Sequence, residues 1–410
     1  MAYAEVMPGQ AHIPIGERVR FYRQAHHKTQ AVVAGLAGVT EDYLSQIERG
    51  LKTPSTALLH RLARVLGVPT SVLFGESAVE PATSAHPLSA AIHTALALSG
   101  EQANPDHSLD LVVLRDRLEA AWRSWQGSPH RYSQTGPLLP GLITDVQAAT
   151  RALRAASDVP ARREASALAA DLYSLLRTFT KRIGRADLSL LVADRGVRAA
   201  EDADDPMRIA AAKWNLGQVL LATNEPEIAE DVTTRAATDL QPHIDGNPDY
   251  LALYGALWLV AGIAQARHRD TWAARESLRN HAARAADTAG DGNLLWTVFG
   301  PTNVALHAVS IEMEAGETSE ALRLADGIDI THCPSIERRT TFFLDLARCY
   351  DQRHEDAGTV LHLLAAEEES SEDLRYNPLA RDLVHGLLRR ARPSLAHKVR
   401  ALAARIDLVR

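Results

Sequence analysis

Several features that define secreted, membrane-spanning or metal-binding proteins are scarce or missing in this sequence. Aromatic residues make up only 5% of the 410 residues, and there are two cysteines, Cys333 and Cys349. Two cysteines cannot form a disulfide framework, and no histidine near them has metal-ligand spacing. Residues 1–10 lack the basic stretch and apolar core of a secretion signal. These absences predict a protein of the reducing cytoplasm that needs no metal or other cofactor.

One uncharged stretch, residues 250–264, has the composition of a membrane span but not its length. Asp249 and Arg267 enclose only 17 residues, whereas a helix that crosses a bilayer needs about 20 apolar residues. The many Ala and Gly residues of this stretch allow helices to pack closely. We therefore expect a buried core helix here rather than a transmembrane helix.

Motifs of common enzyme classes are absent as well. The sequence has no phosphate-binding Gly-x-x-x-x-Gly-Lys loop, no Gly-x-Ser-x-Gly nucleophile elbow and no His-Glu-x-x-His pair. The 17 histidines are scattered, and the acidic run 367–369 is typical of a solvated helix face rather than of an acid–base pair. We expect no enzymatic activity, and a fused small-molecule hydrolase is the least favoured alternative.

Charge is distributed unevenly along the chain. The formal net charge of −7 argues against a protein that coats nucleic acid along its whole length. Residues 1–75, however, carry eight Lys/Arg against five Asp/Glu, a balance of +3 that leaves −10 for the remainder. The polar run 76–87 contains two prolines and no periodic apolar face. We therefore assign residues 1–75 to a basic domain, 76–90 to a linker and 91–410 to a second domain.

The second domain is predicted to consist of helix after helix. Apolar residues recur there at intervals of three and four, as in Leu172, Leu175 and Phe179, with almost none of the alternation that strands show. Breakers such as Asn247-Pro248 and Gly300-Pro301 divide the region into segments of about 15–25 residues. The fold class is therefore predicted to be all-α.

A weak repeat of small and large residues follows the pattern of tetratricopeptide helix pairs, in which small residues lie where two helices cross. Its four copies are Leu216, Gly217, Leu220, Ala229 and Ala236; Trp258, Gly262, Ala274 and Leu278; Gly316, Ala321 and Ile328; and Ala347, Tyr350 and Ala366. Four copies in succession favour a tetratricopeptide-like solenoid of antiparallel helix pairs. The alternative is an irregular helical bundle without a groove.

The first domain has the helix boundaries of a helix-turn-helix. Thr29 and Thr40 are in position to cap two short helices, and Gly38-Val39 makes the turn between them. Small and apolar residues of these helices are predicted to face inward, namely Val33, Ala34, Ala37, Leu44 and Ile47. Two short helices joined by a tight glycine turn form this motif. Further helices, including a short one opened by Val68-Pro69, give a predicted five-helix domain.

The same residues carry the pattern of a known family. The pattern comprises Thr29-Gln30, Ala34, Ala37-Gly38-Val39-Thr40, Tyr43-Leu44-Ser45-Gln46-Ile47-Glu48-Arg49-Gly50 and Pro54. Residues 13–75 closely resemble the Cro/CI repressors, also called the xenobiotic-response-element family. With a helical repeat region behind it, the whole chain resembles actinomycete regulators that join this domain to tetratricopeptide-like repeats. The resemblance implies sequence-specific binding to a double-stranded DNA operator and regulation of transcription.

The docking of such domains on DNA assigns roles to residues. The helix opened by Thr40 would lie in the major groove with its first turns at base edges. We expect base reading by Thr40, Asp42, Tyr43 and Gln46. Glu41 and Asp42 have a second interpretation, since acidic residues at a helix N-terminus are stabilised by the helix dipole. The side chains expected to hold phosphates, which fix register without reading sequence, are Arg20, Arg23, Lys28, Thr29, Gln30 and Lys52.

A helix-turn-helix used only for protein contacts is the alternative. Against it, Gln30 and the polar face of the helix opened by Thr40 have no evident structural purpose. The charge of +3 on residues 1–75 predicts modest, salt-sensitive binding by a monomer. We therefore expect a homodimer that reads two half-sites.

The second domain needs a function of its own. Stacked helix pairs form concave surfaces that bind peptides, proteins or small ligands, and the resemblance to repeat-tailed regulators implies a peptide or small-molecule effector. A DNA-tethered scaffold that docks a partner protein is the alternative.

Four residues are candidates for the ligand groove: Asn215, Trp258, Trp296 and Asn303. An amide side chain can both donate to and accept from a peptide backbone, and aromatic rings can wall a pocket. The alternatives are that Asn215 is a solvated helix residue, that Asn303 bonds locally after Gly300-Pro301, and that the tryptophans belong to the core.

Overall fold

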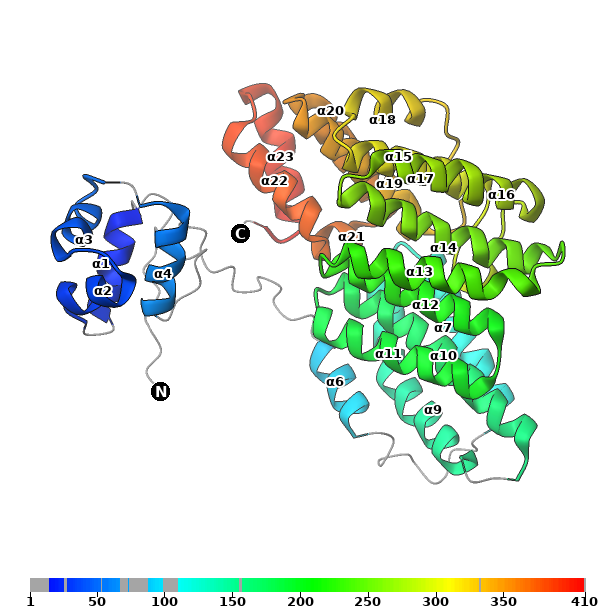
Figure 1. Cartoon of the computed structure of the whole chain (residues 1–410). Coiled ribbons are helices and arrows are strands. Elements are labelled where there is room, and N and C mark those ends of the chain that lie inside the picture. Colours follow the sequence, from blue (N-terminus) through cyan, green and yellow to red (C-terminus); the bar gives the residue numbers. More distant parts are fainter. Residues whose placement is uncertain are drawn as a thin grey trace. The chain divides into compact units, whose positions relative to one another are not determined.

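The chain forms two compact helical units, residues 1–84 and 85–410 (Figure 1). All regular secondary structure in the described residues is helical, which confirms the all-α fold class. The computed structural model describes residues 15–25, 28–52, 54–66, 73, 88–98, 110–154, 157–331 and 333–408. Most of the expected linker 76–90 lies outside these ranges, and α6 begins at Ser89, within its last residues.

The N-terminal unit has four described helices around one apolar core. They are α1 (Ile15–Ala25), α2 (Gln30–Ala37), α3 (Glu41–Glu48) and α4 (Thr56–Leu66). The inward-facing residues expected on α2 and α3, among them Val33, Leu44 and Ile47, are fully buried. The expected fifth helix, opened by Val68-Pro69, lies outside the described residues apart from the buried Leu73.

Local sequence signals determine where α2 and α3 begin and end. The Oγ1 atoms of the two N-cap threonines, Thr29 and Thr40, accept hydrogen bonds from backbone N–H groups three residues on, at 3.3 and 3.2 Å. Gly38 and Gly50 follow the last turns of the two helices with φ of 70° and 74°, a conformation that a Cβ disfavours. The helix-turn-helix boundaries predicted from these residues are therefore confirmed.

The C-terminal unit is an array of antiparallel helices in two layers. Inner helices α10, α12, α14, α17, α19 and α22 each pack against the next in this series, and the helices between them form the outer layer (Figure 1). The helices are α6 (Ser89–Ala97), α7 (Leu111–Gly127), α8 (Arg131–Thr135), α9 (Leu139–Leu153), α10 (Val159–Arg182), α11 (Ala186–Ala203), α12 (Pro206–Ala222), α13 (Pro226–Leu240), α14 (Pro248–Arg267), α15 (Thr271–Ser277), α16 (Arg284–Ala289), α17 (Pro301–Glu314), α18 (Thr318–Ala325), α19 (Ile336–Gln352), α20 (Asp356–Glu369), α21 (Ser371–Tyr376), α22 (Pro378–Arg390) and α23 (Pro393–Arg405). A π-helical stretch, Leu278–Ala283, joins α15 to α16, and 3-10 turns lie at Gly136–Leu138, Gln241–His243 and Leu294–Trp296.

Small residues allow these helix pairs to approach closely. A Cβ on Gly217 of α12 would lie 2.5 Å from the Thr233 side chain of α13, and one on Gly262 of α14 would lie 3.5 Å from the Ala274 carbonyl of α15. Both glycines therefore lie at helix crossings, as the repeat pattern predicts. Gly316 does not, because it lies in the turn between α17 and α18 with φ of 83°.

The uncharged stretch 250–264 lies within α14, a core helix of the array. Within the described chain, α14 and the segment Leu294–Glu314 are long and apolar enough to span a membrane. However, 72% of the apolar window of α14 is buried inside the unit, where it contacts α12, α13, α16 and α17. The interpretation as a buried core helix agrees with this packing.

The array curls so that its first helices contact its last third. Arg131 of α8 donates from Nη2 to Oδ1 of Asp373 in α21 at 2.5 Å, and Tyr132 Oη donates to the same oxygen at 3.0 Å. The Arg131 and Asp373 side chains are both 0% exposed. Gln126 of α7 reaches a different segment, donating from Nε2 to the Trp296 carbonyl at 3.0 Å. Consequently α7 and α8 occupy part of the concave side that a tetratricopeptide-like array would otherwise leave open.

Candidate DNA-binding surface and cavity

The residues expected to read bases lie together on α3 and at its N-cap. Thr40 and Asp42 are exposed, whereas Tyr43 and Gln46 are half-buried. Gln46 Nε2 donates to Asp42 Oδ2 one turn earlier, at 2.7 Å. A pair of this kind stabilises a helix by roughly 0.2–0.5 kcal/mol. The surface is therefore presented to solvent, with two of its polar groups in a weak hydrogen bond that a base edge can replace.

The residues expected to hold phosphates divide into exposed residues and residues with internal partners. Arg20, Thr29 and Lys52 are exposed. Lys28 is half-buried, and its ammonium group donates to the backbone carbonyl of Val65 at the end of α4. Three of the six candidates thus lie at the surface, and Lys28 has an internal partner.

Arg23 and Gln30 require a correction, because both bind the buried carboxylate of Glu48. Arg23 donates from Nε to Oε1 at 2.6 Å and from Nη2 to Oε2 at 2.9 Å, and Gln30 Nε2 donates to Oε2 at 2.7 Å. The side chain of Glu48 is 2% exposed and that of Arg23 is 12% exposed. The hydrogen bonds that Arg23 donates to the Glu48 carboxylate raise the pKa of Arg23. Gln30 therefore has a structural purpose that the sequence did not reveal, and Arg23 is held inside the domain.

Glu48 itself was missed by sequence reasoning, although a signal was present. It occupies the last turn of α3, where the helix dipole disfavours a negative charge. An acidic residue in that position indicates a specific cationic partner inside the fold.

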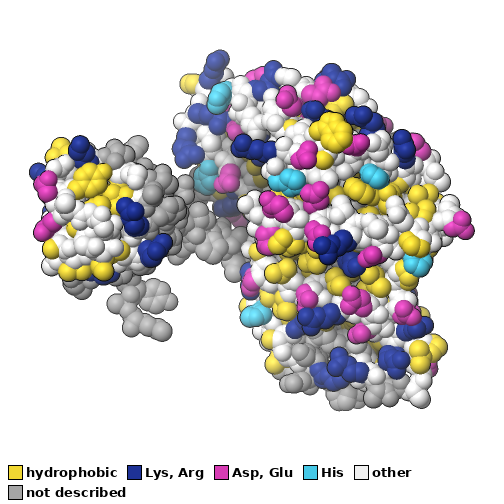
Figure 2. All heavy atoms as spheres, in the orientation of Figure 1, with side chains coloured by type: hydrophobic (Ala, Val, Ile, Leu, Met, Phe, Trp, Pro, Cys, Tyr) yellow, Lys and Arg dark blue, Asp and Glu magenta, His cyan; other side chains and the backbone are white. Residues whose placement is uncertain are grey.

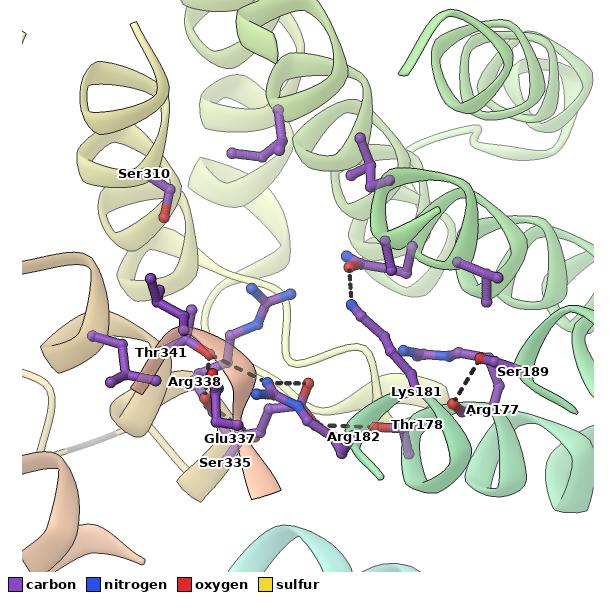
Figure 3. A pocket seen from close by; sticks show the side chains of 18 of the residues that line it. Arg177, Thr178, Lys181, Arg182, Ser189, Ser310, Ser335, Glu337, Arg338 and Thr341 are labelled. Carbon is purple, nitrogen blue, oxygen red and sulfur yellow. Dashed lines mark hydrogen bonds and ion pairs between the residues drawn. The ribbon is translucent and has the colours of Figure 1, made fainter. Parts of the chain in front are cut away.

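The C-terminal unit contains a cavity of about 610 Å³ (Figure 3). Its walls come mainly from α7, α10, α12, α14, α17 and α19 and from the non-helical segment before α17. Small-molecule sites typically occupy about 300–1,000 Å³. Four tryptophans contribute to the lining: Trp122, Trp125, Trp214 and Trp296. The cavity therefore has the size of a small-ligand site and offers flat apolar surfaces beside its polar groups.

Two of the four residues expected to form a ligand groove lie at or directly behind the cavity wall near α17. Trp296 lines the cavity and stacks on Trp122, with ring centroids 5.1 Å apart and planes 5° apart. Asn303 is buried and donates from Nδ2 to the Val298 carbonyl at 2.5 Å, a local bond that holds the wall. Asn303 itself is not part of the lining.

The other two candidates are also outside the cavity lining. Asn215 is 3% exposed, so it is not a solvated helix residue. Its Oδ1 accepts from Arg177 Nε at 2.6 Å, and its Nδ2 donates to the Ala211 carbonyl at 2.9 Å. Trp258 lies half-buried and stacks on His281 with centroids 3.8 Å apart. Asn215 thus positions a cavity residue, Arg177, from behind.

A strained segment between α16 and α17 forms one wall. Leu295, Trp296 and Val298 have φ of 45°, 63° and 52°, in the left-handed region. Conformations of this kind cost about 1–3 kcal/mol each and persist where the surroundings hold them, often at ligand sites. Amide side chains hold this segment: Gln126 donates to the Trp296 carbonyl, and Asn293 accepts from Val298 N–H.

Cations outnumber carboxylates on the cavity wall. The lining includes Arg177, Lys181, Arg182, Arg267, Arg338 and Arg348, against Glu314, Glu337 and Asp345. On the outer surface, by contrast, cationic and anionic side chains are interspersed on the face in Figure 2. Sequence reasoning missed these cations. The available signal was that Arg177 and Lys181 lie one turn apart on α10, amid the apolar residues Leu172, Leu175, Leu176 and Phe179.

Comparison with known proteins bears on the N-terminal unit. Residues 14–73 match the family model described as a helix-turn-helix domain. An uncharacterized HTH-type transcriptional regulator of Mycobacterium tuberculosis is 33% identical over 87 residues, 21% of this chain and 62% of that protein. The HTH-type transcriptional regulator SinR of Bacillus subtilis is 40% identical over 63 residues, 15% of this chain and 57% of SinR. The matches thus span less than two thirds of either relative.

Among solved structures, Bacillus thuringiensis PlcR in complex with the peptide PapR7 and DNA aligns with 67% of this chain and 94% of its own. The sequence identity is 12% and the TM-score 0.27, too low to support an argument from this likeness. The assignment therefore stands on residues 14–73. These residues form a helix-turn-helix domain of the kind carried by bacterial transcriptional regulators, in agreement with the resemblance to the Cro/CI family.

Proposed function

We propose that the chain is a cytoplasmic, sequence-specific DNA-binding regulator of transcription whose helical array dimerises and binds a regulatory small molecule or peptide. The observation that carries the proposal is the solvent-accessible, N-capped α3 within a matched helix-turn-helix domain. In such domains this helix enters the major groove with its N-terminal residues at base edges.

Base reading is assigned to Thr40, Asp42, Tyr43 and Gln46. A glutamine amide can form two hydrogen bonds with adenine, and an aspartate can accept from the amino group of cytosine. Gln46 and Asp42 exchange their mutual hydrogen bond for these contacts. Each well-formed contact of this kind is worth about 1–3 kcal/mol of discrimination against the wrong base.

Phosphate binding is assigned to the exposed residues Arg20, Thr29 and Lys52 and to the backbone amides at the start of α2. Arg23 and Gln30 support this surface indirectly, since their bonds to Glu48 tie α1, α2 and α3 together. The small positive charge of the domain calls for two copies on one operator, with half-site centres about 34 Å apart or a multiple of that.

Effector binding is assigned to the cavity of the C-terminal unit. Its volume of about 610 Å³ and its walls from many helices suit a small ligand better than a docked protein. The alternative, a DNA-tethered scaffold, is favoured by a different observation: Trp272 of α15 is 73% exposed on the outer layer. Exposed tryptophans are frequent anchors of protein interfaces.

Selection from a random duplex library with the full chain tests the DNA-binding part. We expect enrichment of a two-fold symmetric site whose binding weakens steeply with salt. Gln46→Ala should change the preferred base at one position, whereas Lys52→Ala should lower the affinity for duplexes of every sequence to the same extent. Glu17→Gln, an exposed change on α1, serves as the control. The absence of any enriched sequence at low ionic strength would refute the proposal.

A further inference from the structure

We propose that the cavity is the binding site of a small molecule with an oxyanion group, a carboxylate, phosphate or sulfonate, held by Arg177, Lys181 and Arg338. This inference rests on the proposed effector binding and specifies the chemical class of the effector. The inference follows from a comparison of the charged side chains of the cavity. Some of them have an ion-pair partner in the protein, and others do not.

Two cations on α10 have only neutral hydrogen-bond partners. Arg177 Nε donates to the amide oxygen of Asn215 at 2.6 Å, and Lys181 Nζ donates to the amide oxygen of Gln218 at 3.4 Å. Neither forms an ion pair with a carboxylate among the described residues. Arg177 is 4% exposed, and burial lowers its pKa to about 10. Burial, together with the neighbouring Arg177, lowers the pKa of Lys181 well below its ordinary value.

Arg338 of α19 is the third such cation. Its Nη1 contacts Nε2 of His307 at 3.5 Å, and burial together with Arg338 lowers the pKa of His307 to about 3, so this partner is neutral. Arg338 also lies in the first turn of α19, where the helix dipole disfavours a positive charge. The dipole therefore does not explain why a cation is placed there, although the same dipole favours a bound anion.

The carboxylates of the cavity are engaged elsewhere. Glu337 forms its ion pair with Arg182 at 2.7 Å and acts on Arg177, Lys181 and Arg338 only at longer range, and Glu314 pairs with Arg267 at 3.1 Å. Burial raises the pKa of Asp345 to about 6, so its negative charge is itself disfavoured. Arg348 lies 3.6 Å from Glu314, so Arg177, Lys181 and Arg338 are the lining cations that form no ion pair with a carboxylate of the described residues. Buried charge without a partner is unfavourable, and a bound oxyanion would supply the missing partner.

The arrangement of the cations suits one oxyanion between two walls. Figure 3 shows Arg177 and Lys181 projecting from α10, with Arg338 on the facing side beside Glu337. The Arg177 guanidinium lies 5.3 Å from the ring centroid of Trp214, so an apolar surface adjoins the charged groups. The site thus fits an oxyanion attached to an apolar or aromatic body. Such a ligand would add a further link between α10 and α19, which the ion pair of Arg182 with Glu337 already joins.

Fluorescence titration of the full chain with two probes tests the proposal. The probes are 1-anilinonaphthalene-8-sulfonate and N-phenyl-1-naphthylamine, which share a ring system but differ in the sulfonate. We expect one site per chain that binds the sulfonate probe at least about tenfold more tightly, the effect of a charge-assisted hydrogen bond. Lys181→Gln and Arg338→Gln should each remove about tenfold of that affinity and leave the neutral probe unchanged.

A matched control and a stability measurement guard against indirect effects. Arg267→Gln removes a cation of the same cavity that already has Glu314 as its partner. It should lower the affinity for the sulfonate probe by less than Lys181→Gln or Arg338→Gln does. The ligand-free melting temperature of Lys181→Gln, followed by tryptophan fluorescence, should equal or exceed that of the unaltered chain. Equal affinity for both probes, or a lower melting temperature for Lys181→Gln, would overturn the proposal.

Competition distinguishes the sources of the oxyanion. Displacement of the sulfonate probe by inorganic phosphate indicates a phosphate ligand, and displacement by hexanoate indicates a carboxylate with an apolar body. Displacement by neither compound at millimolar concentration would count against an oxyanion site.

Gel shift with the selected duplex separates this inference from the proposed regulatory function. If the sulfonate probe binds the cavity without changing DNA affinity, the oxyanion site stands and the regulatory role fails. If DNA affinity responds to the neutral probe and not to the anionic ones, the regulatory role stands and the oxyanion site fails.

Discussion

The two units differ in whether a buried charged side chain has a counter-charge within the fold. In the N-terminal unit the buried carboxylate of Glu48 receives hydrogen bonds from Arg23 and Gln30, so its charge is matched within the fold. In the cavity of the C-terminal unit, Arg177 and Lys181 have amide oxygens as partners and no carboxylate in the described chain. Removal of one partner from a matched cluster leaves the other charge buried and unpaired, which destabilises the fold, whereas an unmatched cation lowers stability until a partner from outside binds.

The difference is not one between small domains and helical arrays. The C-terminal unit also contains a matched cluster, in which Arg131 and Tyr132 both donate to the buried carboxylate of Asp373. This cluster joins α8 to α21 and closes the array, whereas the unmatched cations face an open volume. The cavity also contains matched pairs, Arg182 with Glu337 and Arg267 with Glu314, so the difference is confined to the cations without an ion pair, Arg177, Lys181 and Arg338.

A substitution in the matched cluster that closes the array should cause the largest loss of stability. Asp373→Asn leaves Arg131 buried without its nearest counter-charge, which should lower the free energy of unfolding by about 3–5 kcal/mol. Urea denaturation followed by tryptophan fluorescence measures it, since all six tryptophans lie in this unit. Asp407→Asn is the control: its salt bridge with Arg375 is exposed, so we expect less than about 1 kcal/mol. Equal losses of unfolding free energy in the two variants would contradict the distinction between this buried cluster and an exposed salt bridge.

A substitution in the matched cluster of the N-terminal unit should cause the second largest loss of stability. Glu48→Gln leaves Arg23 without its counter-charge, and because Arg23 is 12% exposed we expect a loss of about 2–3 kcal/mol, below the range for fully buried pairs. This unit contains no tryptophan, so thermolysin digestion with mass spectrometry is the suitable measurement. Glu17→Gln, an exposed change on α1, should leave the digestion rate unaltered. A Glu48→Gln chain as resistant as the parent would show that Glu48 is not needed.

The same contrast explains how far the sequence predicts the structure. The ends of α2 and α3 follow from Thr29, Thr40 and Gly38, because caps and left-handed turns are set by neighbouring residues in the chain. The closure of the array depends on Arg131 and Asp373, which are 242 positions apart. No local pattern predicts which of many arginines meets which aspartate at that separation.

The sequence predicts a ligand site in the second domain but not which residues line the cavity. The sequence predicts that Asn215 and Asn303 hold a peptide backbone, because amides suit that role, whereas in the structure they bind Arg177 and the Val298 carbonyl. Amide chemistry is the same in both roles, and only the three-dimensional packing decides which groups face the cavity. Among the four candidates, Trp296 alone is part of its lining.

Acid titration probes the neutral partners of the unmatched cluster. Burial and Arg338 lower the pKa of His307 to about 3, whereas an unfolded histidine titrates near 6.5. Below about pH 6.5 the unfolded chain therefore binds a proton at this histidine that the folded chain does not bind. The free energy of unfolding falls by about 1.4 kcal/mol for each pH unit below that point, or by about 2 kcal/mol at pH 5. His307→Gln should lose this part of the acid sensitivity in urea denaturation, and the exposed His93→Gln should keep it. Parallel pH profiles for His307→Gln and the parent would contradict a buried neutral ring.

The exposed face of α3 should give the smallest effect, since its charges are already solvated. Gln46→Ala removes one base contact worth about 1–3 kcal/mol, but the amide gives up its bond to Asp42, worth roughly 0.2–0.5 kcal/mol, to make it. We expect about 1 kcal/mol of lost discrimination at a single base position, measured by fluorescence anisotropy on single-base variants of the selected duplex. Lys52→Ala should instead weaken every duplex equally and reduce the salt dependence by about one phosphate contact. If Gln46→Ala also weakened all duplexes equally, Gln46 would belong with the phosphate-binding residues, and base reading would rest on Thr40, Asp42 and Tyr43.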